Sequence, residues 1–339
     1  MSKDTFSIDI TRKNIRVCDL EEKDGKIEIL SLGYDDIVPN FLLDDNPLLQ
    51  KEQAKKLLQL YQNLKISKKK VNVVLPDSVT YSQIIEMPKL NEQELMLAIR
   101  YQADEFIPMP IDEVYLDIEV LKEDPKNSRQ LTLIIAAPKN TVTRIYNMLS
   151  LAHLVPKNLE NELSVIGRLI ALRFSQSNEC TVLVNFGFSG TSLYLVDPLS
   201  HIIVATRSFK IGLDLIVRDL KVNLNWDEKN TYEALKNIGL TQNATVDIYK
   251  IIYPIMKEMF RELEQFIQLA KSKYNLEVNK VYLFNFDSSI ANFAPTIQSN
   301  MSVPTLPLPI GSILIPNVIT QSFSSEISSF VSVIAAQIK

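Results

Sequence analysis

Residues 6–18 read FSIDITRKNIRVC, and this stretch decides the fold because it joins two apolar runs through a short polar turn. Ile8 and Ile10 lie in the first run, and Ile15 and Val17 lie in the second. An apolar run, a tight polar turn and a returning apolar run are typical of a β-hairpin. We therefore predict that the chain begins with a strand, a turn and a returning strand.

The same pattern occurs a second time at residues 181–195, which read TVLVNFGFSGTSLYL. Asn185 stands in this stretch where Asp9 stands in the first, and Gly187 stands where Thr11 does. A supersecondary unit that occurs twice in one chain indicates two related structural units. The sequence therefore predicts two related α/β lobes, each of which begins with a hairpin.

The residues between the two hairpins divide into the rest of a first lobe and a different segment. Apolar residues recur at helical spacing over residues 47–64 and form a continuous run over residues 71–75, which predicts a helix and then a buried strand. From Tyr81 to Ala152 the pattern changes to strands of alternating polarity and two helices, the first opened by a capping box at Asn91. We interpret this segment as a small α+β subdomain inserted into the first lobe.

The second lobe is predicted to continue with a strand at residues 201–207 and a long amphipathic helix at residues 248–274. The prolines at residues 304–316 predict irregular structure, because proline lacks an amide donor and fixes its own backbone angle. The predicted divisions in chain order are residues 1–75 for the first lobe, 76–152 for the inserted subdomain, 153–178 for the return to the first lobe, 179–324 for the second lobe and 325–339 for a closing helix.

The composition argues against several functions. The chain of 339 residues has 36 Lys and Arg against 40 Asp and Glu, so it lacks the basic excess that favours nucleic acid as a partner. No apolar window reaches the roughly 18 residues of a membrane span, and we expect no direct membrane insertion. Cys18 and Cys180 lie in strand-like runs and are expected to be buried free thiols, as in a reducing compartment. Neither His153 nor His201 has a cysteine or another histidine at the spacing of zinc ligands, which disfavours a zinc site.

Short motifs in the predicted insert and in both lobes stand in the order and spacing of one known family. They are LPDSV at residues 75–79, EMP at 86–88, IPMP at 107–110, AAPK at 136–139, TRS at 206–208 and EALK at 233–236. On these motifs the chain resembles the PilM family of type IV pilus assembly proteins, in the FtsA-like branch of the actin and Hsp70 superfamily. The resemblance implies an α/β, two-lobed, actin-like (ribonuclease H-like) fold with a small α+β subdomain inserted in the first lobe.

The resemblance also implies a nucleotide site between the lobes, with ATP and Mg²⁺ as its cofactors. In this superfamily the backbone amides of the two hairpin turns hold the phosphates, and glycines there permit close approach. Asp9 would position Mg²⁺ through water. The other implied nucleotide-binding residues are Thr11, Asn185, Gly187, Gly190, Thr191, Glu233 and Lys236.

The chain departs from the superfamily pattern at three places in this site. Thr11 stands where glycine is preferred, Asn185 replaces an aspartate that faces the metal, and FNFDS at residues 284–288 replaces a glycine turn beside the adenosine. Glu160 and Glu162 stand near the position that aligns the hydrolytic water in active relatives, but the helix dipole alone favours acidic residues at a helix start. We therefore predict a degenerate site with no catalytic residue and at most weak hydrolysis.

The partner implied by the resemblance is the N-terminal cytoplasmic tail of a PilN-like single-span membrane protein. We expect it to bind in a groove formed partly by the segment from Tyr81 to Ala152, and pilus motor ATPases to be linked indirectly. The protein would then be cytoplasmic and peripheral at the inner membrane. One alternative is an ATP-driven switch, and another is an FtsA-like division protein, which the closing stretch FVSVIAA at residues 330–336 disfavours because it is typical of a buried helix.

Overall fold

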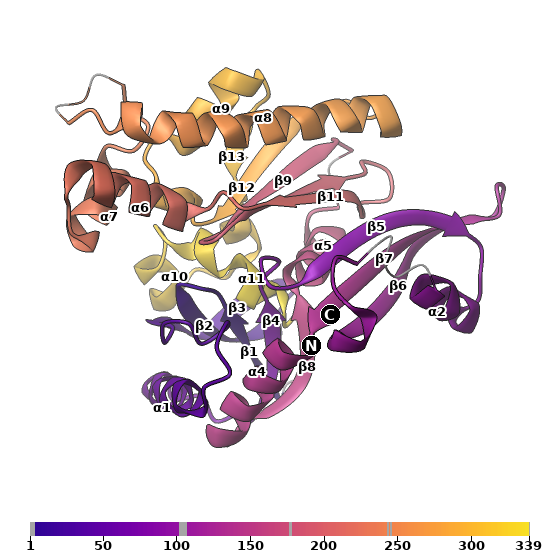
Figure 1. Cartoon of the computed structure of the whole chain (residues 1–339), viewed down its shortest axis with the longest axis horizontal. Coiled ribbons are helices and arrows are strands. Elements are labelled where there is room, and N and C mark those ends of the chain that lie inside the picture. Colours follow the sequence, from indigo (N-terminus) through magenta and orange to yellow (C-terminus); the bar gives the residue numbers. More distant parts are fainter. Residues whose placement is uncertain (1–3, 102–106, 176–177, 243, 245, 339) are drawn as a thin grey trace.

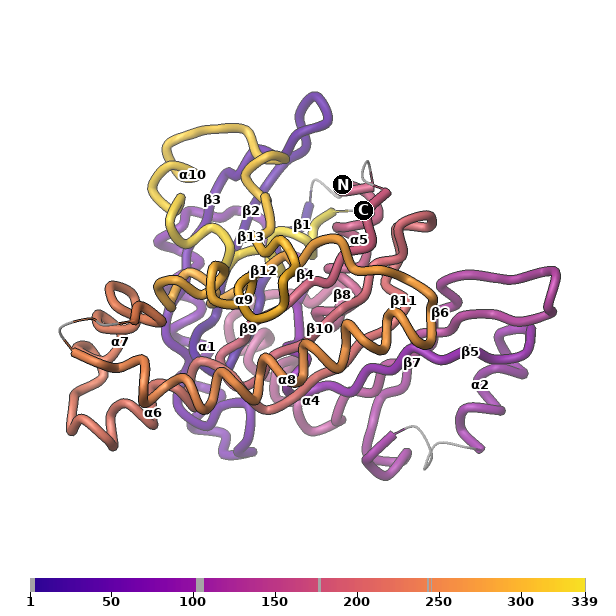
Figure 2. Tube along the Cα trace, turned by 90° about the horizontal axis from the view of Figure 1, so that it is seen from above, coloured from indigo at the N-terminus to yellow at the C-terminus, as the bar shows by residue number. Residues whose placement is uncertain are grey.

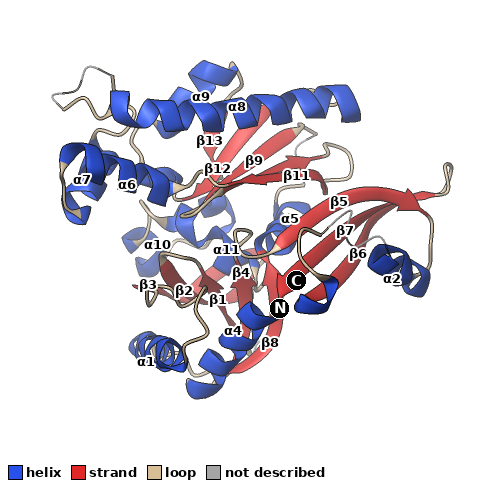
Figure 3. Cartoon of the chain, viewed as in Figure 1, coloured by secondary structure: helices blue, strands red, loops and turns tan. Residues whose placement is uncertain are grey.

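The computed structural model describes residues 4–101, 107–175, 178–242, 244 and 246–338. Two lobes, each with its own sheet, lie one above the other in Figure 1, and a third, smaller sheet extends to one side. Figure 3 shows that helices cover the outer face of each lobe's sheet.

Five strands form the first-lobe sheet in the order β3-β2-β1-β4-β8. The strands are β1 (Thr5–Ile10), β2 (Asn14–Lys23), β3 (Lys26–Asp36), β4 (Lys70–Leu75) and β8 (Val155–Asn161). β1 pairs antiparallel with β2 and parallel with β4. The hairpin predicted from residues 6–18 is confirmed.

Alternation along β1 directs its side chains to opposite faces of the sheet. Phe6 and Ile8 belong to a core that they share with the helices α1 (Pro47–Asn63) and α4 (Lys139–Leu151). Ser7 faces the other side, where its hydroxyl donates a hydrogen bond of 2.6 Å to the carbonyl of Val333. The helices α5 (Glu162–Arg173) and α11 (Val331–Ala335) cover that side. Asp9 points there by the same alternation.

The second lobe repeats the topology of the first. Its strands β9 (Thr181–Phe186), β10 (Thr191–Val196), β11 (Ile203–Phe209), β12 (Lys280–Asn285) and β13 (Thr305–Pro307) lie in the order β11-β10-β9-β12-β13. As in the first lobe, the first strand pairs antiparallel with the second and parallel with the fourth. The duplication predicted from the two hairpins is therefore confirmed at the level of strand order.

Four helices complete the second lobe: α6 (Leu213–Leu224), α7 (Glu228–Asn237), α8 (Tyr249–Tyr274) and α9 (Phe293–Met301). In α8, Met256, Met259, Leu263 and Phe266 recur at helical spacing and are buried against the sheet. This periodicity explains why the helix predicted at residues 248–274 forms.

In its described residues, the inserted subdomain is a three-stranded sheet with the helix α2 (Glu92–Tyr101) packed on it. The strands β5 (Tyr81–Pro88), β6 (Val114–Asp124) and β7 (Arg129–Pro138) lie in the order β5-β7-β6. The predicted capping box is present, because Asn91 and Glu94 exchange two hydrogen bonds of 3.0 Å between side chain and backbone. The predicted continuation of this helix toward residue 107 falls on residues 102–106, outside the described part.

The helix α4 follows β7 in sequence but packs on α1 and on the first-lobe core through Ile145, Met148 and Leu149. On this packing we propose that the inserted subdomain ends near Pro138 and that α4 belongs to the first lobe. This boundary differs from the one predicted at Ala152 from the sequence pattern.

The C-terminal segment runs from the second lobe to the first. The prediction that residues 304–316 are irregular was wrong for β13, which tolerates proline because it is an edge strand. The amide of Ile315 donates a hydrogen bond to the carbonyl of Ile27 in β3 (2.8 Å). The helix α10 (Val318–Ser322) follows, and Figure 2 shows this part of the chain in yellow beside β2 and β3. The closing helix α11 is buried, as predicted. Among the described residues, no helix is long and apolar enough to cross a membrane.

Candidate functional site

A cavity of about 330 Å³ lies between the two lobes. It is lined by the two hairpin turns, the loop after β4, the start of α5 and the ends of β11 and β12. Of the implied nucleotide residues, the structure brings five to this cavity: Thr11, Asn185, Gly187, Gly190 and Thr191. Glu233 and Lys236 lie on the exposed side of α7 and do not line it.

Thr11 makes hydrogen bonds within the first hairpin turn. Its hydroxyl accepts hydrogen bonds from the backbone amides of Lys13 (3.1 Å) and Asn14 (2.9 Å), and its own amide donates to the carbonyl of Asn14 (2.9 Å). A side-chain oxygen that binds amides two and three residues on is the usual role of threonine in turns. Two amides of a turn that would otherwise face a phosphate are therefore already bonded within the turn.

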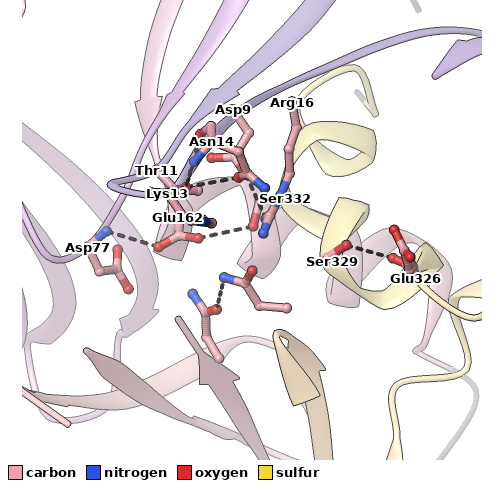
Figure 4. A network of polar contacts seen from close by, with 12 residues as sticks. Asp9, Thr11, Lys13, Asn14, Arg16, Asp77, Glu162, Glu326, Ser329 and Ser332 are labelled. Atoms are coloured by element: carbon pink, nitrogen blue, oxygen red, sulfur yellow. Dashed lines mark hydrogen bonds and ion pairs between the residues drawn. The ribbon is translucent and has the colours of Figure 1, made fainter. Parts of the chain in front are cut away.

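Asp9 is paired with Arg16, the residue directly opposite on β2. Arg16 Nη1 lies 3.1 Å from Asp9 Oδ2, and the two side chains are 1% and 0% exposed. The ring of Phe286 covers the guanidinium, with 4.7 Å from its centroid to Arg16 Cζ. Burial raises the pKa of Asp9, although the neighbouring guanidinium acts to lower it. Figure 4 shows Asp9 and Arg16 side by side, with Glu162 and Ser332 close to them.

This arrangement does not fit a magnesium ion at Asp9. Mg²⁺ requires near-octahedral oxygen ligands and keeps several waters. The carboxylate of Asp9 is fully buried, and the position beside its Oδ2 atom is taken by a guanidinium, which is always charged. The cation that Asp9 binds in this structure is thus a side chain of the same hairpin.

Asn185 is also engaged within the protein. Asn285 Nδ2 donates to Asn185 Oδ1 (2.8 Å), and Asn185 Nδ2 donates to the hydroxyl of Tyr194 (3.3 Å). Asn285 lies at the end of β12 with a φ of 82°, within the stretch that replaces the expected glycine turn. The amide that stands in place of an aspartate therefore links β9, β10 and β12 instead of facing an ion.

The glycines of the second turn are required by the protein's own backbone. A Cβ atom on Gly187 would lie 2.7 Å from the carbonyl oxygen of Gly190, and one on Gly212 would lie 2.4 Å from that of Phe188. Thr191 donates its hydroxyl proton to the carbonyl of Ile211 (2.7 Å). The loop before α6 thus packs directly on the turn, and its close backbone contacts explain these glycines without a ligand.

Two buried carboxyl groups lie at the cavity. Glu162 accepts hydrogen bonds from the backbone amide of Asp77 (3.0 Å) and from the hydroxyl of Ser332 (3.2 Å). Burial, with the nearby Asp77 and Asp9, raises the pKa of Glu162 to about 8. The hydroxyl of Tyr194 in the second lobe donates to Asp77, whose pKa is raised by burial. These contacts join the start of α5, the loop after β4 and β10.

Lys13 reaches from the first hairpin turn into the second lobe. Its Nζ atom lies 2.8 Å from Glu228 Oε1 on α7 and 5.2 Å from the ring centroid of Tyr232. Partial burial alone would lower the pKa of Lys13, but the hydrogen bond to Glu228 and the nearby acidic groups raise it overall. Lys13 therefore links the first hairpin turn to α7 of the second lobe.

A second and larger hollow, of about 870 Å³, lies between the inserted subdomain and the first lobe. We call it the insert groove; its walls are β6 and β7, the edge strand β8 and the helices α4 and α5. On its floor Arg168 makes two bonds to Glu160 (2.6 and 3.0 Å) and one to the carbonyl of Ile338 (2.7 Å). The sequence analysis located this region only as the segment from Tyr81 to Ala152.

Sequence reasoning missed Arg16, Asp77 and Tyr194. Asp77 belongs to the LPDSV motif and follows a buried strand of a partly parallel sheet, the kind of edge where ligand sites form. Arg16 had a signal in the hairpin itself, because a turn closed between Thr11 and Asn14 sets it opposite Asp9. The contact between Tyr194 and Asp77 had none, since the two residues are 117 positions apart.

Two lobes of the same strand order, with their hairpin turns facing a shared cleft, define an actin-like fold. A family model described as "Type IV pilus assembly protein PilM" matches residues 7–330, and the chain belongs to this family.

Solved structures agree on the fold. The "PilM-PilN type IV pilus biogenesis complex" superposes with a TM-score of 0.84 at 18% identity, covering 98% of this chain and 97% of that chain. The ethanolamine utilization protein EutJ from Carboxydothermus hydrogenoformans gives 0.56 at 11% identity, covering 98% and 89%. MreB 5 of Spiroplasma citri, bound to AMPPNP, gives 0.51 at 11% identity, covering 99% and 95%.

Proposed function

We propose that the protein is a scaffold of the type IV pilus assembly platform that binds the N-terminal cytoplasmic tail of a PilN-like membrane protein in the insert groove. Membership of the PilM family supports the pilus role, and it favours that role over the division alternative. The observation that carries the proposal is the groove itself, which runs between two strand edges of different sheets. Through the tail the protein would sit at the inner membrane on its cytoplasmic side and connect indirectly to the pilus motors.

The strand edges suit an extended peptide. In the strand orders of the described residues, β6 ends the inserted sheet and β8 ends the first-lobe sheet, and side chains of both strands line the groove. An added strand gains main-chain hydrogen bonds from such an edge and specificity from side-chain pockets. A tail of a few residues would therefore bind by strand addition, with alternate side chains in the groove.

The lining predicts the chemistry of the tail. Tyr146 and Leu172 line the groove and are 47% and 49% exposed, so each offers an apolar contact. Asp117 and Glu119 line it from β6, and burial followed by the charge of Asp117 raises the pKa of Glu119. A basic side chain on the tail would relieve this repulsion. We therefore propose a tail that alternates apolar anchors with at least one Lys or Arg.

The groove is tested with a labelled peptide that copies the N-terminal cytoplasmic tail of a PilN-like protein, and binding is measured by fluorescence anisotropy. Leu172→Glu should weaken binding at least tenfold, because it places a charge on an apolar wall. Val222→Glu is the matched control, since Val222 is 76% exposed on α6, away from the groove. If the two variants bind the peptide with equal affinity, the insert groove is not the binding site.

We further propose that binding, rather than turnover, is the activity of the protein, and that the cleft between the lobes is degenerate. The bonds within the first turn, the Asp9–Arg16 pair and the Asn185–Asn285 contact support this proposal. Phosphate release from ATP should stay at background with and without the tail peptide. Release that rises several-fold when the peptide is added would favour the ATP-driven switch instead.

A further inference from the structure

Two cationic side chains of the first hairpin contact residues of the second lobe. We propose that these side chains, Arg16 and Lys13, hold the cleft closed from within, so that the lobes keep one arrangement without any ligand. This inference concerns the cleft, so it holds or fails independently of peptide binding in the insert groove.

Arg16 is the first of these two cations. It is fully buried, bonded to Asp9 and covered by Phe286, which belongs to the second lobe. A cation over an aromatic face is attracted by the ring, more strongly when water is excluded. The guanidinium therefore contacts a carboxylate of the first lobe through one oxygen, Asp9 Oδ2, and an aromatic ring of the second lobe at the same time.

Lys13 is the second cation. Its ammonium binds Glu228 at 2.8 Å and approaches the rings of Tyr232 (5.2 Å) and Phe188 (6.0 Å), all three from the second lobe. The Lys13 side chain is 26% exposed and that of Glu228 is 53% exposed, so only the lysine end of the contact is partly shielded from solvent. Ion pairs at an open surface contribute little, whereas one that also lies on aromatic faces loses less to water. We call the contact of Lys13 with Glu228 and these rings the clasp.

A third bond crosses the cleft between the two cations. The hydroxyl of Tyr194 in β10 donates to Asp77, which in turn donates its amide to Glu162 of the first lobe. Contacts of Arg16, Tyr194 and Lys13 therefore each join the first lobe to the second. In a fold whose lobes close around a bound nucleotide, these groups would perform the closing function.

The test measures the distance between the lobes. Nitroxide labels are placed at Lys55→Cys on α1 and Asn223→Cys on α6, two exposed positions. The helices α1 and α6 lie on the same side of the molecule in Figures 1 and 2. Cys18 and Cys180 are buried, and protein without the added cysteines measures any labelling there. Pulsed electron paramagnetic resonance then gives the distribution of distances between the two labels in the full-length protein, with and without Mg²⁺ and ATP.

Wild type should give one narrow distribution that Mg²⁺ and ATP do not change. Lys13→Met and Glu228→Gln should each broaden it toward longer distances, and the double variant should go no further than either single one. Lys23→Met is the control, because it removes the same charge from a pair with Glu28 inside the first lobe (3.3 Å). A Lys13→Met distribution equal to that of Lys23→Met would overturn the clasp, as would a wild type that narrows or shortens when Mg²⁺ and ATP are added.

Discussion

Arg16 Nη1 lies 3.1 Å from Asp9 Oδ2, and neither side chain has more than 1% of its surface exposed. Removing one partner of a buried pair leaves a charge without compensation, which costs ~3–5 kcal/mol of folding free energy. We therefore expect Arg16→Met to lower the free energy of unfolding by about this amount, as measured by urea denaturation.

The double variant Asp9→Asn, Arg16→Met separates charge from packing. It removes the uncompensated carboxylate, so it should recover most of the stability that Arg16→Met alone loses. If the double variant is as unstable as the single one, the loss comes from the shape of the arginine side chain, and the charge argument fails.

The bond from Tyr194 to Asp77 gives a second prediction. Tyr194→Phe removes the donor and leaves a buried carboxyl group with fewer partners, since Asp77 Oδ1 already has none among the described residues. An unsatisfied buried polar group costs ~1–3 kcal/mol, so thermal denaturation should show a loss of that size. Tyr101→Phe, at a tyrosine that is 92% exposed, should be neutral. Equal effects of the two substitutions would mean that the bond contributes nothing.

Glu162 makes stability depend on pH. Burial, then Asp77 and Asp9, raises the pKa of Glu162 from 4.5 to about 8, so the folded protein keeps a proton that the unfolded chain releases. The stabilisation is complete below the unfolded pKa of 4.5 and is lost as the pH rises through 8. Between these values the slope is at most ~1.4 kcal/mol per pH unit.

Glu162→Gln removes this proton. The variant's free energy of unfolding minus that of wild type should therefore increase as the pH rises from about 5 to about 8, because only the wild type loses stability over this range. The exposed Glu264→Gln on α8 serves as the control, and its difference from wild type should stay constant over the same range. A constant difference for Glu162→Gln as well would show that Glu162 is ionised throughout.

The parts of the fold that were predictable are those that local pattern determines. Apolar periodicity predicted the two hairpins and the long helix α8, and the spacing of Asn91 and Glu94 predicted the capping box. Each of these features depends on residues within a few positions of one another. The duplication followed from comparing two such stretches. The placement of α4 on the first lobe was not predictable in this way, because its partner α1 is distant in sequence.

The site was predictable in its position but not in its internal contacts. The hairpin turns located the cleft, yet Lys13 and Glu228 are 215 positions apart, and no local pattern pairs them. The substitutions Thr11 and Asn185 showed that groups had been lost from the family pattern. They could not show what replaced them, because the replacements come from Arg16, Asn285 and α7, which only the tertiary structure brings near.

The last prediction concerns ATP itself, which we expect to bind weakly or not at all. A ligand that binds only the folded state stabilises it by about 2.7 kcal/mol at one hundred times its dissociation constant, so tight binding would give a clear thermal shift. We expect no shift with Mg²⁺ and ATP, and no heat in calorimetry, because Asp9 is already paired with Arg16 and the amides of the first turn are bonded to Thr11. Thr11→Gly frees those amides without touching the ion pair, and Asp9→Asn removes the charge that would face a metal. Micromolar binding to wild type that is lost in Asp9→Asn would mean that the metal ion displaces Arg16 from Asp9. The hypothesis of an ATP-driven switch would then replace that of a scaffold whose cleft is closed.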